Sequence, residues 1–301
     1  RSRRQRQMCI RDRNLMGTGV ALITPFKEDK SIDFPALEKL VDYTIEGGVE
    51  FLVVLGTTAE TATLTAEEQK AVIETVIRAN KQRVALVLGI GGNNTTAVVE
   101  AYKTSDLGAF EAVLTVSPYY NRPSQEGIYQ HYKMIASQTD SKIILYNVPS
   151  RTGSNIEAET TVRLANEFDN IIAIKEASPN FLQSTDVLRQ NTRRDFFVLS
   201  GDDEFALPMT LAGGKGVISV IAQGIPQQFS SMIRLGLERK VDQAYEAHYK
   251  MVEITRAIFA EGNPAGIKSV LHHQGICSPY TRLPLMPATE NLSQTIKKIL
   301  N

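Results

Sequence analysis

Lys175 is the residue in this chain whose type and position most directly suggest covalent chemistry. It follows Ile171–Ile174, a run of apolar and mostly β-branched residues that predicts a short strand buried on both faces. Lysine is rarely buried without a partner, because removing an ammonium group from water is costly. A partly desolvated lysine loses its proton more readily, and the free amine can attack a ketone or aldehyde to form a Schiff base. The alternative is a lysine that reaches solvent from a strand end, paired with Glu176.

Other polar groups follow other apolar runs along the chain. The turn at Gly56–Thr61 offers backbone N–H groups and two adjacent hydroxyls, which suit a carboxylate, although an ordinary strand-to-helix turn has a similar composition. Tyr146 ends another run, and Arg151 lies shortly after it, so this segment offers a proton relay and a bidentate carboxylate ligand, or alternatively a hydrogen-bonded loop. Tyr119 and Tyr120 lie between prolines, where packing at a rim is the alternative interpretation.

The elements that must position these residues alternate between short apolar runs and longer amphipathic stretches, in eight pairs from Gly17 onward. This pattern predicts an α/β fold, a (β/α)8 TIM barrel with additional C-terminal helices. A doubly wound open sheet is the alternative, but neither G-x-G-x-x-G nor G-x-x-x-x-G-K-[ST] follows the first strand. The predicted strands are Val20–Thr24, Phe51–Leu55, Val84–Ile90, Ala112–Val116, Lys142–Tyr146, Ile171–Lys175, Phe196–Leu199 and Gly216–Val220. The predicted helices are Phe34–Glu46, Ala66–Asn80, Thr95–Leu107, Gln125–Ser137, Ala158–Glu167, Asn180–Arg189, Asp203–Leu211 and Pro226–Leu235. Asp33, Thr65 and Ser124 are expected to cap the helices that follow them.

Three segments are expected along the chain. Residues 1–14 are rich in arginine and aperiodic, and we expect them to be non-native or disordered. Residues 15–236 are expected to form the barrel. Residues 237–301 are expected to form a helical extension with helices at Val241–Ala260, Ala265–His272 and Asn291–Leu300, in which the sequence indicates no chemistry.

Composition excludes several classes of partner. The chain has 301 residues with 33 basic and 33 acidic side chains, so its charge gives no reason to expect nucleic acid or an anionic membrane as a partner. Cys9 and Cys277 have no spacing that predicts a metal site or a disulfide framework, and a reducing, cytoplasmic setting fits them best. Apolar runs are much shorter than the ~20 residues of a membrane span, so we expect a soluble protein.

Five segments of the chain together resemble the dihydrodipicolinate synthase family of pyruvate-dependent class I aldolases. The likeness extends from Gly17 to near the C-terminus. The segments are GTTAET at Gly56–Thr61, SPYYNRPSQEG at Ser117–Gly127, LYNVPSRTG at Leu145–Gly153, IKEAS at Ile174–Ser178 and SGDD at Ser200–Asp203.

The resemblance implies a lyase that condenses pyruvate with L-aspartate 4-semialdehyde, the first committed step of diaminopimelate and lysine biosynthesis. It implies a homotetramer built as a dimer of dimers. It also implies no metal and no organic cofactor, because the iminium itself stabilises the carbanion. The implied catalytic residues are Lys175 as the Schiff base, with Tyr146, Thr57 and a Tyr120 from a neighbouring subunit as a proton relay. The implied substrate-binding residues are Thr58 for the pyruvate carboxylate, Arg151 for the aldehyde's carboxylate, and backbone near Gly201 and Ile218.

Two departures from the family pattern bear on the site. The third position of the family's GTTGE turn is Ala59 here, which would cost about 1–2 kcal/mol if that residue needed φ > 0, so we expect a backbone there that tolerates a β-carbon. A possible allosteric cleft for lysine keeps counterparts at Thr61, Asn93 and Tyr119. Its two histidines and its glutamate are replaced by Ala66, Gln69 and Ala97, and Glu100 is the nearest substitute carboxylate. We therefore predict weak or absent inhibition by lysine.

Two other functions remain as alternatives at this stage. A sister aldolase acting on a sugar acid would keep the lysine and the tyrosine, but Arg151 favours a small anionic aldehyde as substrate. A non-catalytic pyruvate-binding scaffold is compatible with a barrel fold alone. The presence of every reacting group disfavours it.

Overall fold

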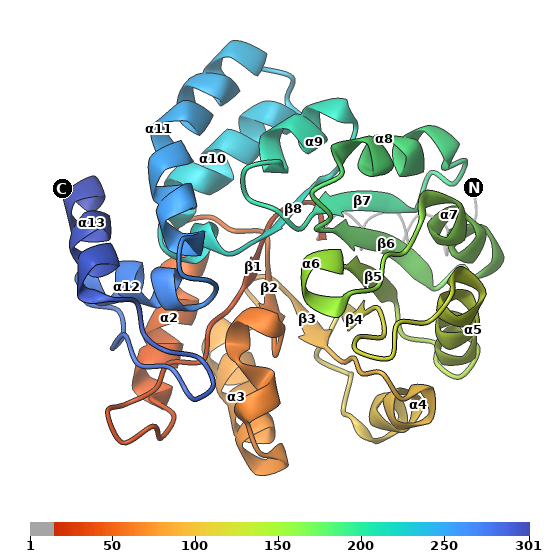
Figure 1. The fold of residues 1–301 in the computed structure, drawn as a ribbon, viewed down its shortest axis with the longest axis horizontal. Helices are drawn as coiled ribbons and strands as arrows, with labels where there is room; N and C mark the ends of the chain where they lie inside the picture. Colours follow the sequence, from red (N-terminus) through yellow and green to blue (C-terminus); the bar gives the residue numbers. More distant parts are fainter. Residues whose placement is uncertain (1–14) are drawn as a thin grey trace. The chain divides into compact units, whose positions relative to one another are not determined.

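The computed structural model describes residues 15–301, and the predicted non-native segment 1–14 lies outside them. Its eight strands follow one another in chain order in a closed parallel barrel (Figure 1). The predicted fold class is therefore confirmed. The strands are β1 (Gly17–Ala21), β2 (Phe51–Val54), β3 (Ala85–Gly89), β4 (Ala112–Val116), β5 (Ile143–Asn147), β6 (Ile171–Glu176), β7 (Phe197–Ser200) and β8 (Gly216–Ser219).

The described chain divides into two compact units. Unit 1 contains residues 85–218 and the segment that ends at Gly17, and unit 2 contains residues 18–84 and 219–301. In unit 1, β3 to β8 pair in sequence order, with Tyr146 of β5 opposite Lys175 of β6. In unit 2, β1 pairs with β2. Most of these strands are buried along their whole length, which explains why they read as continuous apolar runs without alternation.

The helices of unit 1 cover the strands that precede them. Their inner faces share one apolar core with β4 to β7, which includes Tyr132, Ile143, Leu164, Ile174 and Val198. This core fixes the strands whose C-terminal ends carry Tyr146 and Lys175. The helices are α4 (Thr95–Thr104), α5 (Gln125–Ala136), α6 (Pro149–Thr152), α7 (Ala158–Glu167), α8 (Phe181–Gln190) and α9 (Ala206–Ala212).

Unit 2 joins the start of the barrel to the C-terminal helices. Helices α10 and α11 pack on each other, and α11, α12 and α13 form a connected group (Figure 1). The helices are α2 (Phe34–Glu46), α3 (Ala66–Asn80), α10 (Pro226–Leu237), α11 (Val241–Phe259), α12 (Ala265–His273) and α13 (Glu290–Leu300), with 3-10 turns η2 (Thr57–Ala59), η3 (Thr61–Thr63) and η4 (Ile221–Gln223).

The predicted helix caps are confirmed. Asp33 accepts from the backbone of Ala36, Ser124 accepts from Gly127, and Thr65 forms a reciprocal capping box with Glu68. The first strand begins earlier than predicted, at Gly17, because small residues there permit close packing. A β-carbon on Gly19 would lie 2.1 Å from the Phe51 ring. The one-turn helix α6, which starts at Pro149, was not predicted.

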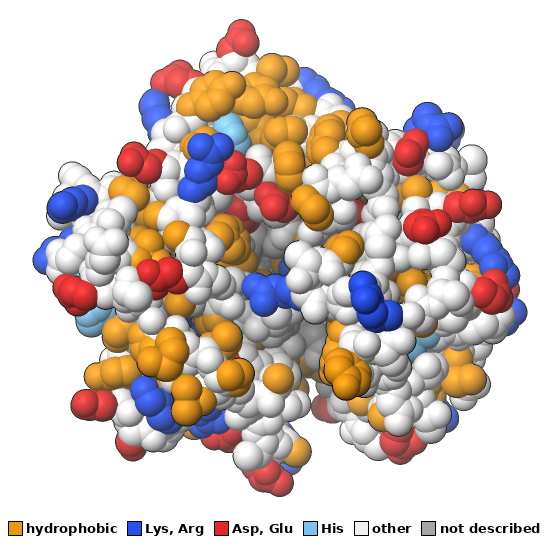
Figure 2. All heavy atoms as spheres, viewed as in Figure 1, with side chains coloured by type: hydrophobic (Ala, Val, Ile, Leu, Met, Phe, Trp, Pro, Cys, Tyr) orange, Lys and Arg blue, Asp and Glu red, His pale blue; other side chains and the backbone are white. Residues whose placement is uncertain are grey.

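Apolar side chains also reach the surface of unit 2. Figure 2 shows orange side chains gathered near the connection between α10 and α11, at the top of the view. Leu237, Val241 and Tyr249 are exposed there, and the ring of Tyr249 stacks on that of Tyr245. In residues 15–301, including α10 and α11, no helix is both long enough and apolar enough to cross a membrane.

Candidate functional site

Lys175 lies at the C-terminal end of β6 in unit 1, almost completely enclosed by protein. Only 5% of its surface is exposed, and its Nζ atom lies 4.3 Å from the centre of the Tyr146 ring on the facing strand. The strand register that pairs Tyr146 with Lys175 produces this contact. The amine therefore lies against the face of the Tyr146 ring, a contact that favours a cation next to an aromatic side chain. The structure therefore brings together the two residues that the sequence analysis considered most important.

Gly201 provides the space that the Lys175 side chain occupies. Its backbone N–H donates to the carbonyl of Glu176 at 2.7 Å, which continues the strand pairing just past β7. A β-carbon at this position would lie 3.0 Å from Cε and 3.1 Å from Cγ of Lys175, and 2.6 Å from Cβ of Ala177. Only glycine fits here without a shift of these neighbours. Ile218, the other predicted lining residue, lies in β8 of the same unit and is 1% exposed.

Glu176 does not pair with Lys175, so the alternative of a neighbouring ion pair is wrong. Successive side chains of a strand point to opposite faces, and Glu176 points away from Lys175 into a buried polar network. Its carboxylate accepts from Asn147 at 3.0 Å, Gln183 at 2.9 Å and the backbone of Ser178 at 2.7 Å. Burial raises the pKa of Glu176, although these donors oppose the shift. The network ties the ends of β5 and β6 together on the face opposite Lys175.

Arg151 lies on α6, directly after β5. The helix ends at Gly153, whose φ of +67° closes the turn. The Arg151 side chain is exposed, and within residues 15–301 its guanidinium forms no ion pair. It is thus available to bind an anion from solvent, close in the chain to Tyr146.

Tyr120 extends away from its own chain. It is 89% exposed and has a φ of +72°, an unusual conformation for an aromatic residue. Its backbone N–H donates to the carbonyl of Thr152 at 3.3 Å, which holds the loop against the end of α6. Contacts within residues 15–301 therefore fix the backbone of Tyr120 but leave its phenol ring without packing.

Thr57 and Thr58 lie in unit 2, on the 3-10 turn that follows β2. Thr57 is exposed and Thr58 is buried, so the two hydroxyls have different environments. The carbonyl of Ala59 accepts from the Thr24 hydroxyl at 2.7 Å. The positive φ of this turn, +55°, occurs at Glu60 and not at Ala59, as expected of a backbone that tolerates a β-carbon at Ala59. Ala59 therefore introduces no backbone strain.

The C-terminal extension holds this turn from long range, which the sequence did not indicate. Lys268 of α12 and Glu60 form an ion pair at 2.5 Å that is completely buried. The backbone N–H of Arg282 donates to the second Glu60 oxygen at 2.9 Å. Burial lowers the pKa of Lys268, and the carboxylate of Glu60 opposes this shift. Removing one partner of such a pair typically costs about 3–5 kcal/mol, so the turn is firmly anchored.

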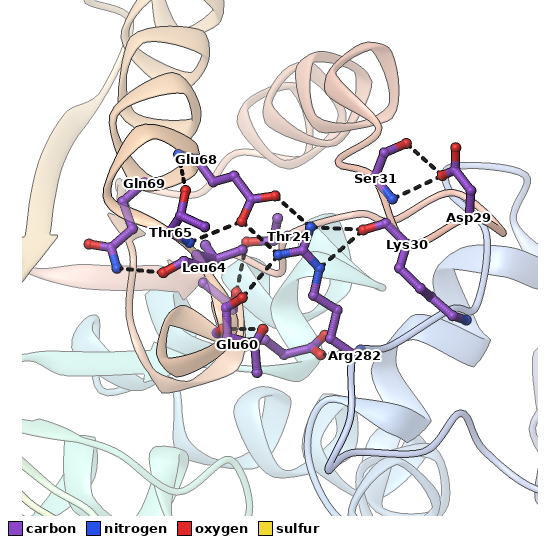
Figure 3. Close-up of polar contacts among 12 residues, drawn as sticks. Thr24, Asp29, Lys30, Ser31, Glu60, Leu64, Thr65, Glu68, Gln69 and Arg282 are labelled. Atoms are coloured by element: carbon purple, nitrogen blue, oxygen red, sulfur yellow. Dashed lines mark hydrogen bonds and ion pairs between the residues drawn. The ribbon is translucent and has the colours of Figure 1, made fainter.

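Arg282 also clamps the segment that follows the turn (Figure 3). Its guanidinium donates to both carboxylate oxygens of Glu68, at 2.6 and 2.7 Å, and to the carbonyls of Thr63 and Lys30. The hydrogen bonds from the Arg282 guanidinium to the Glu68 carboxylate lower the pKa of Glu68. Asn263, which precedes α12, reaches the turn itself, and its Nδ2 donates to the Thr58 hydroxyl at 2.9 Å.

Comparisons with known proteins identify the family to which the chain belongs. The model of the dihydrodipicolinate synthetase family matches residues 14–301. The chain belongs to this family. A 4-hydroxy-tetrahydrodipicolinate synthase from Flavobacterium psychrophilum is 55% identical over 93% of this chain and 96% of its own.

Solved structures of the family superpose closely on the chain. A dihydrodipicolinate synthase described as a monomeric variant has a TM-score of 0.93 at 36% identity, covering 96% of this chain and 97% of its own. The enzyme from Cyanidioschyzon merolae with lysine bound has a TM-score of 0.91 at 35% identity, covering 95% of this chain and 97% of its own. The family match of the sequence and the superposition of the structure thus agree.

The predicted allosteric residues of this family member lie in both units. In unit 1, the Asn93 side chain donates to the carbonyl of Tyr119 at 3.0 Å, so these two residues are in direct contact. In unit 2, the Thr61 hydroxyl donates to the carbonyl of Gly56 at 3.0 Å. The Thr61 proton is therefore already used within the turn.

Residues 15–301 contain no cluster of three or more side chains suited to a metal ion.

Proposed function

We propose that this chain is a 4-hydroxy-tetrahydrodipicolinate synthase, which condenses pyruvate with L-aspartate 4-semialdehyde. The observation that carries the proposal is the enclosed Lys175 amine, 4.3 Å from the centre of the Tyr146 ring. Family membership supports the same reaction. The Flavobacterium psychrophilum relative, which is named 4-hydroxy-tetrahydrodipicolinate synthase, also supports this reaction.

In the proposed reaction, the Lys175 amine attacks the ketone carbon of pyruvate, and the oxygen leaves as water to give an iminium. The iminium accepts electrons when a methyl proton is removed, so an enamine forms without a metal or an organic cofactor. The enamine carbon then attacks the aldehyde of the second substrate. The amine of the second substrate finally attacks the iminium carbon, which releases Lys175 and closes the ring. Tyr146, Thr57 and Tyr120 are the proposed proton relay.

Carboxylate recognition is assigned to two places in the chain. Thr58 and the backbone N–H groups of its turn are proposed to bind pyruvate. Arg151 is proposed to bind the aldehyde substrate, since its exposed guanidinium matches a carboxylate in shape and charge. Backbone at Gly201 and Ile218 is proposed to line the pocket.

We further propose a homotetramer built as a dimer of dimers, located in the cytoplasm, in which Tyr120 completes the site of a neighbouring subunit. The support is the exposure of the Tyr120 ring on a backbone that a hydrogen bond to the carbonyl of Thr152 holds in place. Mixing inactive Lys175→Arg and Tyr120→Phe proteins tests this. Hybrid dimers should recover activity, because one site then contains an intact Lys175 and an intact Tyr120. No recovery from mixtures shown by native mass spectrometry to contain hybrids would assign Tyr120 to its own subunit.

The reaction itself is tested with purified protein and a panel of aldehydes. Product should form from pyruvate and L-aspartate 4-semialdehyde, measured by coupling to a reductase that consumes the cyclic product. Turnover of neutral sugar aldehydes in preference to the semialdehyde would instead indicate a sister aldolase.

A further inference from the structure

Asn263 contacts the hydroxyl of Thr58, the residue proposed to bind the pyruvate carboxylate. It belongs to the C-terminal extension, far from Thr58 in sequence, and its Nδ2 donates to Thr58 Oγ1 at 2.9 Å. Thr58 is 3% exposed, so its hydroxyl has few alternative partners. A hydroxyl that accepts a hydrogen bond keeps its own proton available for donation. Because Thr58 Oγ1 accepts from Asn263, the Thr58 hydroxyl is left to donate its own proton to a ligand.

The other end of the Asn263 amide has an unusual environment. Its Oδ1 is buried and has no hydrogen-bond partner among residues 15–301. The reversed amide would let Oδ1 accept the Thr58 proton, and that proton would then be lost to any ligand. A buried acceptor without a partner reduces stability, and native proteins keep such groups mainly at sites where they serve a function.

The same extension keeps Asn263 and the turn in a fixed relation. Lys268, shortly after Asn263, pairs with Glu60, shortly after Thr58, and both side chains are fully buried. The backbone N–H of Arg282 adds a further hydrogen bond to Glu60. The two segments are thus joined by further contacts next to the Asn263–Thr58 hydrogen bond, so its geometry does not depend on one flexible side chain.

We propose that Asn263 is a positioning residue for carboxylate recognition, which makes Thr58 a hydrogen-bond donor toward pyruvate. This inference rests on the proposed function and assigns the C-terminal extension a part in substrate selection. It predicts that changes at Asn263 weaken pyruvate binding before they affect the second substrate.

Two substitutions separate the possible roles. Asn263→Ala removes the donor and should raise the pyruvate concentration needed for half-maximal Schiff-base formation by about 3- to 10-fold. Asn263→Asp keeps the shape but accepts the Thr58 proton and adds a negative charge, so the increase should reach roughly 100-fold. Asn291→Ala, at an exposed position of the same extension, is the matched control and should behave as the native protein.

The readout is borohydride trapping at graded pyruvate concentrations, together with KM values for both substrates and thermal unfolding. In a Thr58→Val background, Asn263→Ala should have no further effect on pyruvate dependence, because its influence passes through the hydroxyl. If the native protein traps pyruvate and both Asn263 variants keep its pyruvate dependence, this inference is wrong while the proposed function stands. If the native protein traps nothing, the proposed function fails first. If the Asn263→Ala variant does not fold, the isosteric Asn263→Asp variant tests the inference, and a native pyruvate dependence of that variant would overturn it.

Discussion

A methyl group added at Gly201 should disable Lys175 more than it destabilises the chain. The new β-carbon would lie 3.0 and 3.1 Å from two carbons of the Lys175 side chain and 2.6 Å from Cβ of Ala177. Overpacking of this kind typically costs about 1–3 kcal/mol of stability. Displacing a reacting group by about 1 Å can reduce its rate ~100-fold. The Gly201→Ala variant should therefore fold with a lowered melting temperature and react with pyruvate about 100 times more slowly.

The assay is a time course of pyruvate adduct formation, followed by borohydride quenching and intact-mass measurement. A Gly201→Ala, Ala177→Gly double variant removes the closest contact and leaves those with Lys175, so it should recover most of the stability and little of the rate. Gly108→Ala is the control, because its β-carbon would meet only the exposed Asp106 side chain, at 3.3 Å. A Gly201→Ala protein that forms the adduct at the native rate would refute the steric argument.

Three further predictions follow from the site and from the core. Arg151→Ala should reduce aldehyde utilisation about 10- to 100-fold and leave pyruvate trapping unchanged, and the opposite pattern in steady-state kinetics would reverse the assignment. Burial lowers the pKa of His131 from 6.5 to about 4, so between these values the unfolded chain binds a proton that the folded chain lacks. The free energy of unfolding should thus fall by on the order of 2 kcal/mol as the pH drops from about 7 to about 5, measured by urea titration at both pH values. If the His131→Gln variant loses as much stability over the same range as the native protein, His131 is not the cause of the loss. Lysine should inhibit the native enzyme about 10- to 100-fold more weakly than an Ala66→His, Gln69→His, Ala97→Glu variant, and equal inhibition would direct attention to Glu100.

The sequence predicted the parts of the molecule that depend on local patterns. Eight apolar runs gave the barrel order, and the caps at Asp33, Thr65 and Ser124 marked helix starts that the structure confirms. Lys175 and Tyr146 could be found because each is the second-last residue of a strand that is buried along its length. The first strand was placed late because Gly17 and Gly19 have low strand propensity, although close packing requires small residues there.

The parts that could not be predicted depend on contacts distant in the chain. Glu176 was considered as a partner of Lys175 because it is adjacent in sequence, whereas strand geometry directs it to the opposite face. Asn263 and Lys268 lie about 200 residues from Thr58 and Glu60, and no local pattern connects them. The extension was therefore expected to lack chemistry, and its link to the turn became visible only in the folded chain.

The central claim is that Lys175 forms a Schiff base with pyruvate, and borohydride trapping tests it most directly. The native protein treated with both reagents should gain the mass of one reduced pyruvyl group, and peptide mapping should place that mass on Lys175. The Lys175→Arg variant, which keeps the charge but lacks a competent amine, should gain none. A native protein with no pyruvate-dependent gain in mass, or a gain that survives in Lys175→Arg, would contradict the account.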